Sequence, residues 1–184
     1  VAVIRIDDGP IKIWSEDLRV PKGQMGEIAV KGMHVTGEYF RRVSDMAQAK
    51  IGAEKGFWHR MGDLGYFDAQ GRLWFCGRKA QRVKTAQGYH YTICAEGVFN
   101  VHPAVKRTAL VGAGLTPVLC VEREKTATIT EDVLKKELLE LGERQAFTQN
   151  IKDILFHPGF PVDIRHNAKI SREKLAVWAA EQLA

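Results

Sequence analysis

The stretch FWHRMGDLGYFDAQGRLWFCGRKAQRVK, from Phe57 to Lys84, holds an acid, a hairpin and a basic segment in immediate succession. The acid, Asp63, ends a short predicted loop. In the hairpin that follows, apolar residues 66–67 and 73–75 flank a turn with a glycine at its end. The charged segment from Gly77 to Lys84 has few large apolar groups, as is typical of an exposed connection between domains.

Asp63 is the candidate binding residue of the predicted loop. Gly62 frees the backbone beside it, and a single carboxylate on a glycine-supported loop can accept two hydroxyl hydrogens of a ribose. The same residues also suit a plain turn acid with no ligand. The loop taken alone leaves both interpretations open.

Composition and charge narrow the class of protein. The chain has 184 residues, 45% of them hydrophobic and 27% charged, which suits one or two globular domains. We expect no transmembrane segment, because no apolar run is long enough to cross a bilayer. Three cysteines without Cys-x-x-Cys spacing predict neither a disulfide framework nor a metal site, and they fit a cytoplasmic protein.

The formal charge of +5 leaves a second class of function open. The basic run from Arg78 to Lys84 could belong to a nucleic-acid-binding module. Nucleotide phosphates or fatty-acid carboxylates satisfy the same charge, and no recognition helix or ribonucleoprotein-type aromatic motif is present. We therefore expect no nucleic-acid partner.

Periodicity divides the chain into a β-rich part and an α/β part. Alternating apolar residues predict strands at 1–6, 11–14 and 26–32, and residues 44–53 suggest a helix with Ser44 or Asp45 as its N-cap. Later patterns predict helices at 96–101, 130–141 and 171–183 and strands at 107–111, 118–122 and 155–157. Thr130 and Ser171 are the expected N-caps of the last two helices.

Five motifs in order resemble those of the adenylate-forming enzymes: acyl-CoA synthetases, peptide-synthetase adenylation domains and luciferases. They are GEIAVKG (26–32), HRMGD (59–63), Gly77-Arg78, the block from Val83-Lys84 through Glu96 to His102-Pro103, and IRHNAKISREKL (164–175). The resemblance implies the C-terminal part of an α+β fold. Residues 1–77 would be the last, antiparallel β subdomain of a large domain, 78–84 a hinge, and 85–184 a small mixed α/β domain.

The resemblance also implies roles for individual residues. Lys169 falls on the lysine that bridges the substrate carboxylate and the ATP α-phosphate, and Asp63 and Arg78 fall on nucleotide contacts. Ala80 stands at the hinge pivot, where the family has an acid or a lysine, so the large domain rotation of the family is not predicted from this position. Lys84 is a possible second-step or hinge residue.

The segment that guides coenzyme A in the family is altered here. Gln87, Thr92 and Cys94 stand where the family has a glycine, a proline and an acid. Ala168 replaces the usual glycine beside Lys169, and residues 165–167 also depart from the pattern. Within the family, the blocks at 84–96 and 164–175 look most like β-lactone synthetases of long-chain olefin biosynthesis.

Such an enzyme is expected to adenylate a 2-alkyl-3-hydroxy fatty acid with ATP and Mg²⁺, and to release AMP as a β-lactone closes. Its partners would be ATP or AMP, the hydroxy acid, and other enzymes of the olefin pathway. The triphosphate loop, the acyl pocket and most of the Mg²⁺ site lie upstream of Val1 in the family, so we expect this polypeptide to be inactive alone. An ordinary thioester-forming acyl-CoA ligase remains the alternative.

Overall fold

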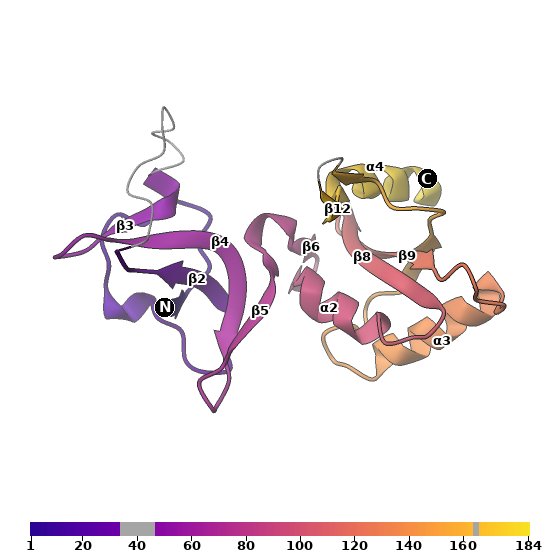
Figure 1. Cartoon of the computed structure of the whole chain (residues 1–184), viewed down its shortest axis with the longest axis horizontal. Coiled ribbons are helices and arrows are strands. Elements are labelled where there is room, and N and C mark those ends of the chain that lie inside the picture. The colour runs from indigo at the N-terminus through magenta and orange to yellow at the C-terminus, as the bar shows by residue number, and fades with distance from the viewer. Residues whose placement is uncertain (34–46, 164–165) are drawn as a thin grey trace. The chain divides into compact units, whose positions relative to one another are not determined.

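The computed structural model describes residues 1–33, 47–163 and 166–184. Within these ranges the chain divides into two compact units, Val1–Ala80 and Gln81–Ala184 (Figure 1). The division lies inside the segment 78–84 that the sequence marks as a hinge. That segment's role as a hinge stays a proposal.

The described part of the first unit is built on antiparallel strands. They are β1 (Ala2–Ile4), β2 (Gly26–Val30), β3 (Lys50–Gly52), β4 (Phe57–Phe67) and β5 (Leu73–Arg78), with a short 3-10 helix, η1 (Glu16–Leu18). The strand order is β1-β2-β4-β3, and β5 also pairs with β4. Ala2, Ile4, Ala29 and Ile51 are fully buried in one cluster, and Trp14 stacks on Trp58 with ring centroids 4.1 Å apart.

Two local predictions for this unit are wrong. The predicted helix 44–53 is helical at 47–49, but Lys50–Gly52 is a strand that pairs with β4. Fully buried Ile51 explains the difference, because pairing and burial override helix propensity. The predicted strand 11–14 forms only an isolated bridge between Ile13 and Gly52.

Some of the sequence predictions lie outside the described residues. They are the N-caps Ser44 and Asp45, the departure from the family pattern at Arg165, and the segment Gly37-Glu38-Tyr39-Phe40, which stands where the family usually has Gly-Tyr.

The second unit is a mixed sheet between helices. Its elements are η2 (Lys79–Gln81, which begins in the first unit), β6 (Val83–Thr85), β7 (Gly88–His90), α2 (Thr92–Phe99), β8 (Val105–Ala113), β9 (Thr116–Arg123), α3 (Glu131–Glu143), β10 (Asp153–Phe156), β11 (Val162–Asp163), β12 (His166–Ile170) and α4 (Arg172–Leu183). Strands β8 and β9 are antiparallel, β9 and β10 are parallel, and the order is β10-β9-β8. The predicted strands and the helix at 130–141 are confirmed, with Thr130 as the N-cap of α3.

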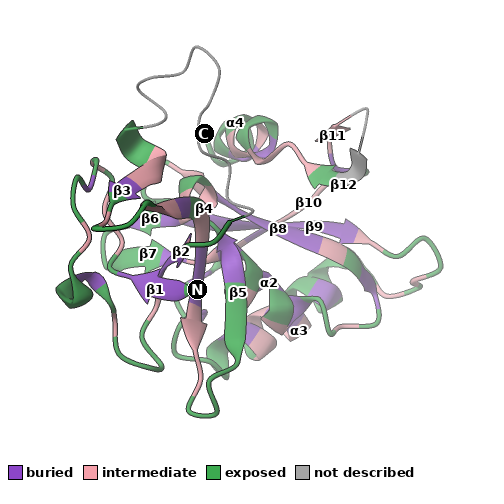
Figure 2. Cartoon of the chain, turned by 60° about the vertical axis from the view of Figure 1, so that its left-hand side comes forward, coloured by how far each residue is buried: buried purple, intermediate pink, exposed green. Residues whose placement is uncertain are grey.

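Alternation along β8 and β9 separates two cores. Leu110 and Leu119 face the core formed with α2 and α3, whereas Val111 and Cys120 face the core formed with α4. Figures 1 and 2 show the buried strands between the two helical layers. The period of two follows from strand geometry, in which successive side chains point to opposite faces.

Helix α2 begins four residues earlier than the predicted start at Glu96. Its N-cap position is Tyr91, whose side chain makes no capping hydrogen bond, so the usual polar start signal is missing from the sequence. Ser171 is at the N-cap position of α4 as predicted, but its side chain makes no capping hydrogen bond either. None of the helices in the described residues is long and apolar enough to cross a bilayer.

We predict that residues 81–184 fold when expressed alone, because both helical cores of the second unit lie within them. Thermal unfolding followed by circular dichroism should show one cooperative transition. Val83 is 4% exposed and belongs to the core with α2 and α3. Val83→Ala in the fragment should therefore lower the free energy of unfolding by about 1.5–3 kcal/mol. A non-cooperative melt of the unmutated fragment would contradict the prediction.

Candidate functional site

Strand pairing brings Asp63 and Arg78 together. In the register of β4 and β5, Asp63 lies opposite Arg78, and the register shifts at Leu64 and Gly65 as in a β-bulge. Gly62 has φ +67°, a left-handed conformation that side-chain-bearing residues rarely adopt. The predicted loop 59–63 is therefore wrong as a loop, because these residues belong to the eleven-residue strand β4. The glycine and the shift distort this strand beside Asp63.

The carboxylate of Asp63 is partly shielded and lies beside the guanidinium of Arg78. Arg78 Nη1 lies 2.9 Å from Asp63 Oδ1, and the side chains are 59% and 18% exposed, respectively. The contact is at ion-pair distance, but Oδ1 is shielded from water and has no partner with hydrogen-bond geometry. Because Oδ1 is shielded, the exposed part of the Asp63 side chain lies on its other atoms, and a ligand could reach the carboxylate only there.

A buried charge cluster connects β2, β4 and Lys79, the residue that follows β5. Glu27, which is 1% exposed, accepts from Arg60 Nε at 3.1 Å, Arg60 Nη2 at 2.7 Å and Lys79 Nζ at 3.1 Å. Arg60 also donates to the Gly9 and Asp7 carbonyls. Arg60 precedes Asp63 by three positions, and Lys79 directly follows Arg78. The cluster therefore fixes the backbone on both sides of the Asp63–Arg78 pair.

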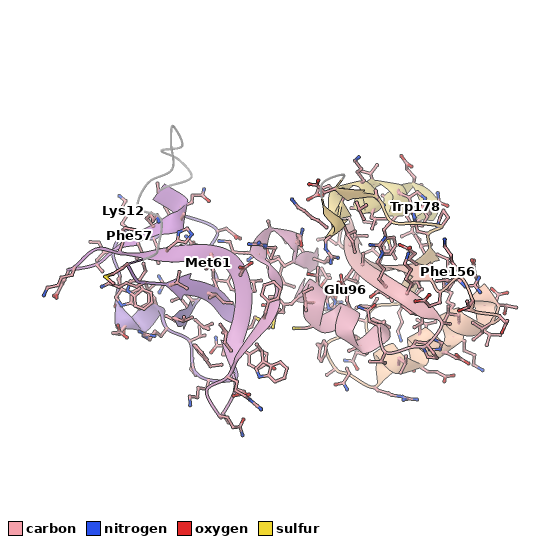
Figure 3. All side chains as sticks on the ribbon, viewed as in Figure 1. Lys12, Phe57, Met61, Glu96, Phe156 and Trp178 are labelled. Atoms are coloured by element: carbon pink, nitrogen blue, oxygen red, sulfur yellow. The ribbon has the colours of Figure 1, made fainter. Side chains whose placement is uncertain are left out.

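The sequence analysis missed this cluster, because it predicted a strand at 26–32 without considering a partner for Glu27. The signal was an acid inside the apolar run Gly26-Glu27-Ile28-Ala29-Val30, where a charge is buried only if it is paired. Figure 3 shows the side chains of this unit on β4 and its neighbouring strands, with Met61 labelled.

The two candidate hinge residues differ in their surroundings. Ala80 is exposed within η2, which buries none of its residues. Lys84 is exposed on β6 between the buried side chains of Val83 and Thr85. Strand β6 pairs with β7 in a small hairpin that the sequence analysis did not predict.

Lys169 presents an exposed ammonium. It lies on β12, which pairs with β11 and which the sequence analysis did not predict as a strand. Its side chain is 69% exposed, and Nζ is 3.9 Å from Asp163 Oδ2. Asp63 and Arg78 lie in the first unit, whereas Lys84 and Lys169 lie in the second.

A buried ion pair lies near Lys169 in the sequence. Arg172 Nη2 donates to Glu96 Oε2 at 2.9 Å, and Nη1 donates to Glu96 Oε1 at 2.5 Å. Burial raises the pKa of the Glu96 carboxyl above its usual value, while Arg172 and the Leu110 N–H act in the opposite direction. The sequence analysis placed both residues on family motifs but did not predict that they contact each other.

The described side chains form neither a metal-binding cluster nor a disulfide. Within residues 1–33, 47–163 and 166–184, no group of three or more histidine, cysteine or acidic residues could hold a metal ion. The three cysteines lie in these ranges, and none of them is in a disulfide. Burial raises the pKa of the Cys120 thiol to about 12, so this thiol is neutral at physiological pH.

The chain is similar throughout to two curated proteins. It is 50% identical to the olefin β-lactone synthetase of Xanthomonas campestris, covering 99% of this chain and 34% of the relative. It is 49% identical to the protein of the same name from Stenotrophomonas maltophilia, covering 100% and 35%. The chain thus spans about a third of the length of these relatives. No protein-family model matches it.

Solved structures support the same fold. The amide bond synthetase McbA of Marinactinospora thermotolerans matches with a TM-score of 0.75 and 24% identity over 97% of this chain and 34% of that one. The o-succinylbenzoate-CoA synthetase of Bacillus subtilis, in complex with its acyl-adenylate, matches with a TM-score of 0.69 and 27% identity over 90% and 33%. The fold is that of the C-terminal part of adenylate-forming enzymes, as predicted. The chain corresponds to the C-terminal part of an adenylate-forming ligase and is similar over its whole length to olefin β-lactone synthetases.

Proposed function

We propose that the chain is the nucleotide-facing and hinge-containing part of an ATP-dependent, AMP-forming ligase. The observation that carries the proposal is the Asp63–Arg78 contact, which places a partly exposed carboxylate suited to a ribose hydroxyl next to a cation suited to phosphate. Half of the residues are identical to those of olefin β-lactone synthetases. One fold neighbour was solved with bound ATP, and another in complex with an acyl-adenylate.

The proposed first step activates a carboxylate. An oxygen of the acid attacks the α-phosphorus of ATP, and pyrophosphate leaves with the electron pair of the broken P–O bond. The attacking carboxylate and the phosphate are both anionic, so they repel each other. The Lys169 ammonium would reduce this repulsion at the reacting oxygens, and Mg²⁺ would be bound mainly by the phosphates. Asp63 and Arg78 would hold the ribose and phosphate ends of the nucleotide.

The proposed second step is internal. The 3-hydroxyl oxygen of a 2-alkyl-3-hydroxy fatty acid attacks the activated carbonyl and loses its proton, and AMP leaves as the β-lactone closes. An internal nucleophile has a high effective concentration and needs no path for a separate thiol. The altered residues Gln87, Thr92 and Cys94 support this step over thioester formation.

The acyl-CoA ligase remains the second candidate. One specific observation favours it: 35% identity over 140 residues to the 2-succinylbenzoate–CoA ligase of Bacillus mycoides, over 73% of this chain. The nucleic-acid-binding module has less support, because three basic side chains of the run from Arg78 to Lys84 already contact groups of their own unit. Arg78 contacts Asp63, Lys79 contacts Glu27, and Arg82 lies over the ring of Tyr89 at 4.3 Å.

We also propose a cytoplasmic location, which the absence of disulfides among the three cysteines supports. The hinge at 78–84 is part of the same proposal, with Ala80 at its pivot and Lys84 as a possible second-step residue. An association with other enzymes of olefin biosynthesis stays a prediction.

The role of Asp63 can be tested in a full-length protein comparable in length with the curated relatives. Asp63→Ala removes a charge-assisted hydrogen bond to the ribose, so ATP affinity should fall by roughly 1.5–3 kcal/mol in calorimetric titration. Glu54, an exposed acid ahead of β4, provides the matched control, and Glu54→Gln should bind ATP normally. Equal ATP affinity in the Asp63→Ala variant and the unmutated protein would contradict the proposed contact.

The role of Lys169 is the test of the proposed function itself. Lys169→Ala should slow pyrophosphate release by about 10²–10³-fold, which corresponds to about 2.7–4 kcal/mol of transition-state stabilisation. ATP binding should change little, because it depends on Asp63 and Arg78. Lys169→Arg should rescue poorly, since a planar guanidinium differs in shape from a compact ammonium.

Lys174 is the control for Lys169, because it is also an exposed lysine and lies on α4. Lys174→Ala should release pyrophosphate at the normal rate. A normal rate for Lys169→Ala, or an equal loss for Lys174→Ala, would show that the first step does not depend on Lys169.

The two ligase candidates predict different products. Full-length protein given ATP, Mg²⁺ and a 2-alkyl-3-hydroxy fatty acid should release AMP at the same rate with or without coenzyme A. Mass spectrometry of the products should detect the β-lactone and no thioester. Accumulation of the acyl-CoA, with AMP release dependent on the thiol, would favour the acyl-CoA ligase.

A further inference from the structure

The Glu96–Arg172 pair connects two elements that are distant in the sequence. Glu96 lies on α2, where Figure 3 labels it, and Arg172 is the first residue of α4. Their side chains are 6% and 12% exposed, so this is a buried ion pair with two parallel contacts. Bidentate arginine–carboxylate pairs fix orientation as well as distance. The start of α4 is therefore held in a defined position against α2.

The pair also occupies the open edge of the sheet. Strand β8 is at the end of the order β10-β9-β8, so its outer backbone groups have no neighbouring strand within that sheet. Glu96 Oε1 accepts from the Leu110 N–H at 2.7 Å, and Arg172 Nη1 donates to the Leu110 carbonyl at 3.3 Å. The pair thus supplies the acceptor and the donor that a further strand would provide.

Arg172 follows Lys169 by only three positions. The backbone between them is short, because β12 ends at Ile170 and α4 begins at Arg172. Ser171 contributes its N–H to the Pro161 carbonyl at 2.8 Å, but its side chain makes no capping hydrogen bond. A buried anchor therefore holds one end of the segment, while the exposed Lys169 ammonium is at the other.

The charge on Arg172 has one anionic partner in this contact. The Cys120 thiol faces the same charges but is neutral, because burial raises its pKa to about 12. Without Arg172, the Glu96 carboxylate would be a buried charge without a counter-charge, which is strongly unfavourable. Removal of either member therefore weakens the anchor at α4.

We propose that the Glu96–Arg172 pair is a positioning device that sets the location of Lys169 for the adenylation step, an inference that rests on the proposed function of Lys169. Glu96 and Arg172 act through the β12–α4 segment and do not touch the reacting atoms. A catalytic group misplaced by about 1 Å can lose about 10²-fold in rate. The pair thus contributes to the rate of the first step and not to ATP affinity.

The test measures pyrophosphate release and the KM for ATP in the full-length protein. Glu96→Gln and Arg172→Met should each lower kcat by roughly 10- to 10²-fold with the KM for ATP unchanged. Arg172→Lys should lower kcat less than Arg172→Met does, because lysine keeps the positive charge. It should not restore the full rate, because lysine cannot form the two parallel contacts. The exposed pair Lys152–Glu143 is the control, and Glu143→Gln should leave kcat unchanged.

A double-mutant comparison separates positioning from a general structural role. In a Lys169→Ala background, Glu96→Gln and Arg172→Met should cause no further loss of kcat, because the residue that they position is gone. Equal fold losses in both backgrounds, or normal kcat in the folded single variants, would overturn the proposal. If non-cooperative unfolding shows that Arg172→Met is not properly folded, the kcat of Glu96→Gln decides whether the proposal holds. That variant keeps an amide oxygen that can still accept from the Leu110 N–H. A normal rate for Lys169→Ala alone would instead reject the proposed function.

Discussion

A carboxylate can be buried in a protein only if positive charge and hydrogen-bond donors replace the water that it loses. Each unit of this chain meets that constraint with a basic side chain from a distant part of the sequence. In the first unit Arg60 and Lys79 surround Glu27, and in the second Arg172 pairs with Glu96. The Glu96–Arg172 pair joins the helices α2 and α4, whereas Glu27 and Arg60 lie on strands β2 and β4, which also pair through their backbones. The buried carboxylates thus set where several chain segments meet.

The candidate site residues lie next to these anchors and remain accessible. Arg78 directly precedes Lys79, and Lys169 lies three positions before Arg172. The anchoring side chains are largely buried, whereas Arg78 and Lys169 are 59% and 69% exposed. This arrangement combines a fixed backbone with a side chain that can reach a ligand. The local sequence around Lys169 or Arg78 does not reveal this arrangement, because the acid that pairs with the neighbouring anchor residue lies far away in the sequence.

The sequence predicted the elements whose signals are local. Helix α3 has a threonine N-cap and buried Leu134 and Leu138 four residues apart, and β8 and β9 show regular alternation. Residues 50–52 and 59–63 were mispredicted because their strand conformation comes from pairing: residues 50–52 pair with the nearby residues 57–59, and residues 59–60 pair with the more distant β2. The family motifs indicated the candidate site residues, and strand register places Asp63 opposite Arg78. The acid inside the apolar run 26–30 signals that Glu27 needs a partner, but the partners of Glu27 and Glu96 lie far away in the sequence, so only the structure identifies them.

The anchors also define how the two units can be linked. Lys79 is tied to Glu27 in the first unit, and Val83 is packed in the core of the second. Residues 80–82 connect these fixed points, and the four Cα–Cα steps from Lys79 to Val83 span at most about 13–14 Å. Rotation at the proposed hinge would therefore come from backbone torsions within this short span. The family commonly has an acidic or lysine side chain at the position of Ala80, and alanine adds no charged group there. In this chain the proposed pivot would therefore depend on backbone torsion and on the anchor at Lys79.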